Sequence, residues 1–446
     1  MFQLIQAKLS KFGFEQASLR FRALRGAIWT IGGLGANQVI RLASNLALTR
    51  LLFPEAFGLM SLVQVFLFGL QMFSDIGVTP AIIHSKRGDD PGFLDTAWTI
   101  SAGRGLLLWL GACAIAYPVS RFYREPMLFK LLPAVGLTAF ISGLNSTKLA
   151  AANRQLSIKR ITIIELSTYV LSIVVTIGLA WMKRSIWALV IGAIVGSVAQ
   201  AFATQAFLPG PWNRIKFDRE AVRELTGFGR WIFVSSALGF VCSQGDRLLL
   251  GRLFDVRFLG IYSIALNLAG IANMLSSQLG SRILFPTYAE LERTRPDAVY
   301  PALFRARAIL LSVAAGVSVV FVVLGPWLIH HMYDRRYVEA GWILQVLAIS
   351  SLLGSVGSSY SDVLLARGKT RVLAWLIACN IALQMVGMIV GSHFGSRGVV
   401  VGLAVAALAM YPITAVTYRS LKVWQPALDG LAILVAVLGA IFLRLR

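Results

Sequence analysis

Long uninterrupted stretches of apolar residues constrain this chain more than any other feature of its sequence. Each runs for about 20 to 28 residues, and an α-helix of that length crosses a hydrocarbon core of about 30 Å. Hydrophobic residues make up 57% of the 446 positions and charged residues 14%, whereas soluble domains carry about 25% charged residues. The pattern predicts an all-α polytopic membrane protein.

The number of these stretches predicts about 12 transmembrane helices, in two pseudo-symmetric six-helix bundles. A shorter apolar run at 428–443 raises the count to 13 if it also spans. Spans are expected at 26–49, 57–82, 96–119, 127–147, 161–182, 185–207, 228–250, 257–280, 308–329, 341–365, 371–392 and 397–418.

The net charge of +22 does not indicate a nucleic-acid binder, because the basic residues lie in short loops between apolar stretches rather than on one solvated face. With the N-terminus inside, the cytoplasmic segments hold 25 basic residues and the outer segments 13. This bias predicts a cytoplasmic N-terminus. Residues 1–25 read as a basic amphipathic segment on the cytoplasmic membrane surface. The three cysteines have no metal-site spacing, and no metal or cofactor is expected.

The sequence also contains an internal repeat. A shift of 202 positions brings Trp29 onto Trp231, Gly58 onto Gly260 and Ser61 onto Ser263. Six spans per repeat is an even number, so the two halves enter the membrane in the same orientation. Parallel repeats of this kind place a substrate path between the halves. The predicted domains are 1–25 (the surface segment), 26–222 and 223–424 (the two bundles) and 425–446 (the extra hydrophobic segment).

Two arginines lie within the apolar spans of the first half. Arg41 has Asn37 and Asn45 one helical turn away on either side, and Arg104 lies between Gly103 and Gly105. Charges inside a bilayer usually face a water-filled cavity or a partner, so a cationic substrate-binding cavity is predicted around the two arginines. Interhelical hydrogen bonding is the alternative, equally weighted for the two asparagines and less favoured for the two arginines.

Span seven, the counterpart of span one in the second half, carries two charged residues. Under the same shift Asn45 maps to Arg247 and Ser44 to Asp246. Arg247 joins the predicted cavity residues, unless it simply pairs with Asp246. Three carboxylates, Asp75, Asp246 and Glu165, are candidates for coupling to H⁺ or Na⁺. The alternatives are backbone capping for Asp75 and snorkelling to the cytoplasmic surface for Glu165.

Three motifs carry a family resemblance: R-L-L-F-P-E-A-F-G at 50–58, F-S-D-I-G-V-T-P-A-I-I at 73–83 and Y-S-D-V-L-L-A-R-G-K-T-R at 360–371. The chain resembles the polysaccharide transporter (Wzx-like oligosaccharide flippase) branch of the multidrug/oligosaccharidyl-lipid/polysaccharide exporter (MOP) superfamily. The resemblance extends over residues 20–424 in span number, repeat and loop length.

This resemblance implies two six-helix bundles around a cationic cavity, working by alternating access. The implied substrate is an undecaprenyl-pyrophosphate-linked oligosaccharide, flipped across the bacterial inner membrane for exopolysaccharide, O-antigen or capsule biosynthesis. Arg41 and Arg104 would suit its pyrophosphate, because a guanidinium pairs with phosphate in a bidentate way. The expected partners are this lipid-linked oligosaccharide, the bilayer, and a polysaccharide polymerase with its chain-length machinery.

Two other functions are weighed against the flippase. A drug or cation antiporter of the same superfamily would need an acidic cavity, whereas the most central charges here are Arg41 and Arg104. A membrane glycosyltransferase or polymerase would need large outer loops with catalytic residues. The expected outer loops are short, and Glu55 is the only acidic residue in the first. The chain is therefore not expected to be an enzyme.

Overall fold

The computed structural model describes most of the chain beyond the N-terminal segment. The predicted surface segment 1–25 lies outside the described residues. Described are residues 29, 32–74, 77–85, 87–88, 90–154, 157–226, 232–279, 288, 290–291, 294 and 299–445.

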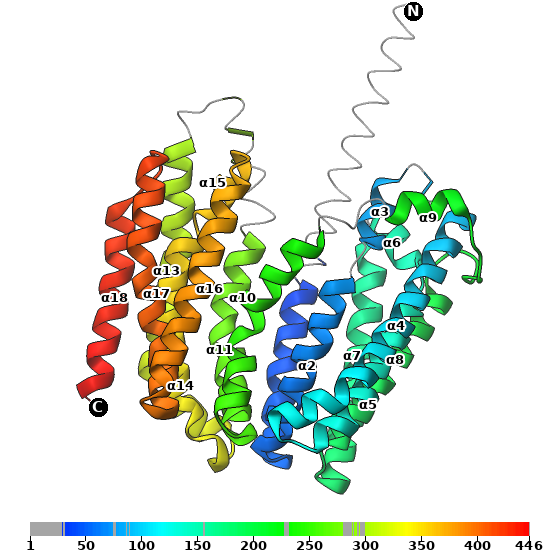
Figure 1. Cartoon of the computed structure of the whole chain (residues 1–446), viewed down its shortest axis with the longest axis horizontal. Coiled ribbons are helices and arrows are strands. Elements are labelled where there is room, and N and C mark those ends of the chain that lie inside the picture. The colour runs from blue at the N-terminus through cyan, green and yellow to red at the C-terminus, as the bar shows by residue number, and fades with distance from the viewer. Residues whose placement is uncertain are drawn as a thin grey trace, which may run out of the picture. The chain divides into compact units, whose positions relative to one another are not determined.

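The chain divides into two compact units, unit 1 with residues 1–52 and 66–237 and unit 2 with residues 53–65 and 238–446. Helix α2 (Pro54–Ser74) belongs partly to each. Unit 1 also contains a helical segment at 32–51 and α3 (Val78–His84), α4 (Pro91–Tyr123), α5 (Met127–Gly143), α6 (Lys148–Arg154), α7 (Ile158–Lys183), α8 (Trp187–Phe207) and α9 (Arg219–Thr226) (Figure 1). Unit 2 contains most of α10 (Ile232–Leu253) and α11 (Val256–Leu279), α13 (Val299–Met332), the 3₁₀ turn η3 (Arg335–Tyr337), α14 (Ala340–Ser358), α15 (Ser361–Ala366), α16 (Thr370–Ser392), α17 (Gly395–Ser420) and α18 (Pro426–Leu445).

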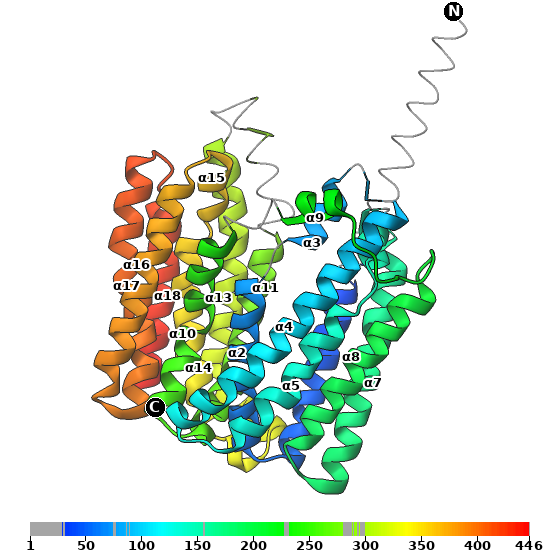
Figure 2. The ribbon, with the colours of Figure 1, turned by 45° about the vertical axis from the view of Figure 1, so that its right-hand side comes forward.

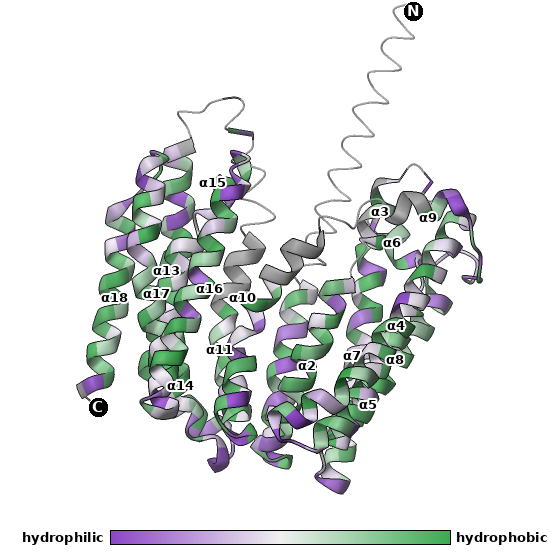
Figure 3. Ribbon diagram, viewed as in Figure 1, coloured by the Kyte–Doolittle hydropathy of each residue, from purple (hydrophilic) through white to green (hydrophobic). Residues whose placement is uncertain are grey.

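The long helices have the length and composition of membrane spans. Among the described residues, 9 helices are long and apolar enough to cross a membrane, and Met127–Gly143 and Val256–Ile271 are shorter apolar helices. Figure 3 shows apolar residues along the long helices and hydrophilic residues concentrated toward their ends. The prediction of an all-α multi-pass membrane protein is confirmed.

Two predicted spans end earlier than expected, and a third contains a turn. The span predicted at 57–82 is two helices, because α2 ends at Ser74 and α3 begins after Gly77, whose φ of 72° is left-handed and suits glycine. The helix of the span predicted at 127–147 ends at Gly143, and α6 begins only at Lys148. The span predicted at 341–365 is confirmed as the apolar stretch Ala340–Ala366, with a turn at 359–360 between α14 and α15. Hydropathy averaged over a whole span does not locate such breaks, because only a few polar residues mark each of them.

Short helices cover one end of unit 1. In Figures 1 and 2, α3 and α9 lie together beside the first turns of α4, and both contact it. Helix α4 begins at a favourable cap, since the Asp90 carboxylate accepts from the Gly92 amide and Pro91 occupies the first position.

The segment before α9 runs along this helix start. Alternate backbone amides, those of Arg214, Lys216 and Asp218, donate to the side chains of Asp95, Thr99 and Thr96. The chain leaving α8 is therefore fixed to unit 1 before α9 begins.

Residues related by the 202-position shift touch one another within unit 2. The Ser263 hydroxyl donates to the Ser61 hydroxyl at 3.0 Å, and both side chains are buried. A Cβ on Gly58 would collide with the Val256 carbonyl, and a Cβ on Gly260 with that of Pro54, which is 202 positions before Val256. Reciprocal contacts of this kind arise at a local two-fold axis. Residues that the 202-position shift relates in sequence are therefore also related in space, where α2 packs against α11.

The order of helix lengths repeats as well. Helix α13 begins 208 residues after α4, and α16 begins 212 residues after α7. The offset exceeds 202 because α11 is longer than α2, and because the connections from α11 to α13 and from α13 to α14 are longer than those from α2 to α4 and from α4 to α5. Among the described residues, six long helical segments up to α8 thus correspond to six from α10 to α17. The predicted domain boundary between 222 and 223 stays a prediction.

Helix α18, predicted only as an extra apolar run, packs in unit 2 against α13 and α14. Its first turn carries Asp429, which forms an ion pair of 2.6 Å with Arg307 of α13, and both side chains are 0% exposed. Arg307 also donates to Ser359 and Gln425, while the Tyr360 hydroxyl donates to Asp429. Every member of this buried group has a partner, as a charge in this environment requires.

We expect Asp429→Ala to lower the free energy of unfolding by about 3–5 kcal/mol, because it leaves Arg307 as an unpaired buried charge. Arg305→Ala, at an exposed position on the same helix, is the matched control and should change stability by about 0.5 kcal/mol or less. The measurement is thermal and denaturant unfolding of the purified protein in detergent.

The double variant Arg307→Met/Asp429→Leu should regain most of the lost stability, because apolar residues of similar volume often replace a buried ion pair without cost. An Asp429→Ala protein as stable as the wild type would show that the ion pair does not hold α18 in place.

Candidate functional site

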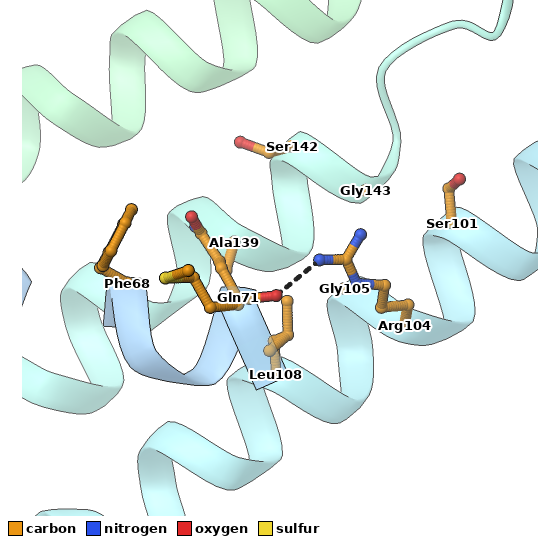
Figure 4. Close-up of a pocket in the computed structure, with 10 residues that line it drawn as sticks. Phe68, Gln71, Ser101, Arg104, Gly105, Leu108, Ala139, Ser142 and Gly143 are labelled. Carbon is orange, nitrogen blue, oxygen red and sulfur yellow. Dashed lines mark hydrogen bonds between the residues drawn. The ribbon is translucent and has the colours of Figure 1, made fainter. Parts of the chain in front are cut away.

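A pocket in unit 1 surrounds Arg104. It has a volume of about 520 Å³ and lies among the last turns of α2, the first half of α4 and the end of α5. Arg104 is the one charged residue among the described residues that line it. Figure 4 shows its guanidinium reaching from α4 toward Gln71 on α2, and it donates to the Gln71 carbonyl and the Ser74 hydroxyl, each at 2.9 Å. These bonds hold the positive charge at the pocket wall.

Glycines allow the helices of this pocket to approach each other. A Cβ on Gly105 would lie 3.0 Å from the Ala139 carbonyl oxygen, and a Cβ on Gly143 would lie 2.6 Å from that of Ser101. A Cβ on Gly103, by contrast, would meet no atom within 4 Å. Of the two glycines that flank Arg104, only Gly105 therefore serves the close approach of α4 to α5.

A second pocket in unit 1 brings together Asn37 and Glu165, two residues that the sequence assigned to different roles. It has a volume of about 330 Å³ and lies among the helical segment 32–51, α7 and α8. Glu165 is exposed and Asn37 half-buried. The remaining polar residues that line it are Thr168, Tyr169, Ser172, Ser197 and Gln200. A carboxylate among hydroxyls and amides provides the oxygen ligands that a proton or a small cation requires.

Arg41 and Asn45 are half-buried on the helical segment 32–51. Neither is among the described residues that line the two pockets of unit 1. Arg41 lies near Tyr169, which also lies beside Ser44. Through Tyr169, Arg41 neighbours the pocket of Glu165, while Arg104 lines the other one. The prediction that the two arginines share one cavity stays a prediction.

The charged residues predicted in the second half have local partners. Asp246 accepts a hydrogen bond of 2.7 Å from the Tyr262 hydroxyl on α11, and Arg247 donates to Gln244 at 2.9 Å. The Arg247 Nε atom is buried and has no hydrogen-bond partner. Asp246 therefore links α10 to α11 within unit 2, and its role in ion coupling stays a prediction. Arg247 keeps one donor unused. Asp75 lies outside the described residues.

Sequence reasoning missed Lys148, which it counted among the basic residues of a cytoplasmic loop. Its buried ammonium donates to the carbonyls of Gln205, Leu208 and Gly210 at 2.7, 3.3 and 3.2 Å. The carbonyls at a helix C-terminus lack partners within the helix, so Lys148 caps α8. Burial lowers the pKa of Lys148. No local pattern of the sequence separates such a residue from an ordinary loop lysine.

Charged residues also pair at the surface of unit 1, where solvent makes an ion pair weaker than a buried one. Arg87 lies 2.8 Å from Asp218 and 3.2 Å from Asp90. Its hydrogen bond lowers the pKa of the Asp218 carboxyl, so this contact is present at neutral pH and is lost as pH falls through that lowered value.

We expect Gly143→Ala to separate α4 from α5 and to disturb the Arg104 pocket, because the added methyl group meets the Ser101 backbone. Thermal unfolding should detect a loss of about 1–3 kcal/mol. Gly103→Ala is the matched control, since its methyl group meets open space and alanine favours a helix. Equal stability of the two variants would contradict the close contact.

Comparisons with known proteins extend over nearly the whole chain. A profile of the polysaccharide biosynthesis protein family matches residues 47–342. The lipopolysaccharide biosynthesis protein WzxC of Escherichia coli (strain K12) is 22% identical over 438 residues, which cover 92% of this chain and 85% of that protein. The succinoglycan biosynthesis transport protein ExoT of Rhizobium meliloti (strain 1021) is 22% identical over 79% of this chain and 70% of its own length.

Solved structures share the fold. An inward-facing multidrug resistance MATE family transporter of the MOP superfamily aligns with a TM-score of 0.67 at 14% identity, over 85% of this chain and 94% of that one. The lipid II flippase MurJ, in an inward closed conformation, aligns with a TM-score of 0.66 at 12% identity, over 94% of this chain and 98% of that one. These likenesses show a shared fold. The profile match covers more than half of the chain, which therefore belongs to the polysaccharide biosynthesis protein family.

Proposed function

We propose that this protein flips an undecaprenyl-pyrophosphate-linked oligosaccharide across the bacterial inner membrane by alternating access, for polysaccharide biosynthesis. The observation that carries the proposal is the basic pocket of unit 1, in which Arg104 is held by Gln71 and Ser74. An arginine in a membrane-embedded pocket suits the pyrophosphate, because a guanidinium matches phosphate oxygens in charge and geometry. The relatives WzxC and ExoT, named for polysaccharide biosynthesis and transport, support the same substrate class.

Arg41 is the second proposed contact for the pyrophosphate, and Asn37, Asn45 and Arg247 are proposed to complete the polar path. The N-terminus is proposed to lie in the cytoplasm, as the charge bias of the loops indicates. A polysaccharide polymerase and its chain-length machinery would receive the flipped units on the outer side.

The competing function is a drug or cation antiporter. A cationic drug would be repelled from the Arg104 pocket, where the described lining offers no carboxylate. The Glu165 pocket is the feature that favours cation movement, and we propose that it couples glycan transport to H⁺ or Na⁺ rather than binding a drug.

Arg104→Ala should abolish export of the polysaccharide while leaving the protein in the membrane. Loss of a charged hydrogen bond to phosphate costs about 1.5–3 kcal/mol, which weakens binding of undecaprenyl pyrophosphate about 10- to 100-fold. Arg104→Lys should be intermediate, because it keeps the charge but not the fork of donors. Export is measured as extracellular polysaccharide, and binding with the purified protein in nanodiscs.

Arg121→Ala, an exposed position near the other end of α4, is the matched control and should export normally. Arg41→Ala is also expected to stop export. Full export by an Arg41→Ala/Arg104→Ala protein would refute the cationic site, and binding of organic cations in place of the lipid would favour the antiporter.

Glu165→Gln should make transport insensitive to an imposed ion gradient, since an amide cannot exchange a proton and binds Na⁺ weakly. Proteoliposomes with a pH gradient or a Na⁺ gradient, applied separately, distinguish the two ions. Glu220→Gln, on the surface of α9 with its side chain 89% exposed, is the control. A Glu165→Gln protein that responds to the gradient as the wild type does would exclude this pocket as the coupling site.

A further inference from the structure

Unit 2 contains a pocket that neither the proposed pyrophosphate contact nor the proposed ion coupling uses. It has a volume of about 290 Å³ and lies among the second half of α14, the middle of α16 and the second half of α17. No charged residue is among the described residues that line it. Its polar lining residues are Ser350, Ser358, Asn380, Gln384, Tyr411, Thr414 and Tyr418.

Two carboxamides on α16 form one wall of this pocket, which we call the amide pocket. Gln384 donates one long hydrogen bond of 3.4 Å to Asn380, one helical turn away. Each carboxamide has two N–H donors and an oxygen with two lone pairs, so this single bond uses only a small part of their capacity. Inside a bilayer, polar groups without partners are costly. The remaining donors and acceptors therefore favour a polar occupant.

Hydroxyl groups on the facing helices offer mainly acceptors. Thr414 donates its hydrogen to the Met410 carbonyl at 3.1 Å, and Ser350 and Ser358 make longer bonds to carbonyls at 3.5 Å. A hydroxyl that donates to a helix carbonyl keeps its oxygen lone pairs for a ligand. The amide pocket thus presents donors from α16 and acceptors from α14 and α17.

A mixed set of neutral donors and acceptors selects the chemistry of the occupant. A phosphate would need donors with positive charge, and a cation would need carboxylates or several carbonyls. An acyl chain would leave the carboxamides without partners. A sugar ring satisfies both kinds of group, because each of its hydroxyls donates and accepts.

Aromatic rings complete the match. Tyr411 and Tyr418 line the pocket with Leu353 and Ile377, and aromatic and aliphatic surface suits the C–H faces of a sugar ring. Tyr418 is held in place by stacking on Tyr360, with ring centroids 4.2 Å apart. The guanidinium of Arg307 lies over the Tyr360 ring, and its charge is neutralised by Asp429. The pocket therefore stays uncharged. Its volume is near the lower end of small-molecule sites, about 300 Å³, which suits a single ring.

We propose that the amide pocket binds an uncharged sugar ring of the transported glycan. The inference rests on the proposed function and adds to it a division of labour, in which unit 1 binds the charged part of the substrate and unit 2 binds a neutral sugar.

The test compares two synthetic probes on the full-length protein in nanodiscs: bare undecaprenyl pyrophosphate, and the same lipid carrying one glucose, galactose or N-acetylglucosamine. The wild type should bind at least one sugar-bearing probe more tightly than the bare lipid. Asn380→Leu and Gln384→Met should weaken binding of that probe about 10-fold, as the loss of one or two hydrogen bonds predicts, and leave the bare lipid within 2-fold. Arg104→Ala should weaken both probes.

Controls separate binding from folding. Ser392→Ala removes an exposed hydroxyl near the end of the same helix, where Ser392 bonds to Ile389, and should change neither affinity. Thr414→Val keeps the shape of the residue, removes one acceptor and should weaken only the sugar-bearing probe, so the proposal can be tested even if an α16 variant misfolds.

Three results would overturn the inference. Wild-type protein that binds bare and sugar-bearing lipids equally would refute the amide pocket while leaving the flippase proposal intact. Pocket variants that weaken both probes equally, or neither, would do the same. Wild-type protein that binds none of the lipids would refute both proposals.

Discussion

A lipid bilayer offers no hydrogen bonds, and the arrangement of this protein depends on that constraint. Every polar group within a span needs a partner from the protein, from water in a cavity or from a substrate. Most buried polar groups in the described part of the chain have a partner from the protein itself. Arg307 has Asp429, Ser359 and Gln425, and Lys148 has the carbonyls at the end of α8. Other polar groups line pockets, such as Arg104 in unit 1 and Asn380 and Gln384 in unit 2, where water or a substrate can bind them.

The same constraint explains what the sequence predicts well. A helix satisfies its own backbone, so a membrane protein without a barrel must consist of long apolar helices, and the sequence located nearly all of them. It could not locate the ends of α2 and α5, because those ends depend on the backbone conformation of a few residues and not on the hydropathy of a whole span. At Gly77 that conformation is left-handed.

The candidate site was harder to predict than the fold. Arg104 stood out because an arginine within a span is rare, and it does line a pocket. Arg307 directly precedes the span predicted at 308–329 and was therefore counted as a loop charge. Its partner Asp429 is 122 positions away, so no local pattern of the sequence reveals the ion pair. Likewise, the partner of Asp246 is Tyr262 on the next helix, and the role of Asp246 in ion coupling stays a prediction. A charge reveals its role only through its partner, and partners distant in sequence require the tertiary structure.

The repeat offers a reason for two pockets of different chemistry. The repeat gives two halves with the same order of long helices. Residues that the repeat relates, such as Ser61 and Ser263, are constrained where they contact each other. Away from such contacts each half can diverge, because a pocket residue is constrained by its ligand and not by its counterpart. In unit 1 the arginine at the pocket donates to a carbonyl and a hydroxyl, and it is the one charged residue among the described residues that line that pocket. In unit 2 the arginine behind the pocket is paired with a carboxylate, which cancels its charge. A substrate with one charged end and one neutral end suits such a pair of pockets better than a substrate of uniform charge does.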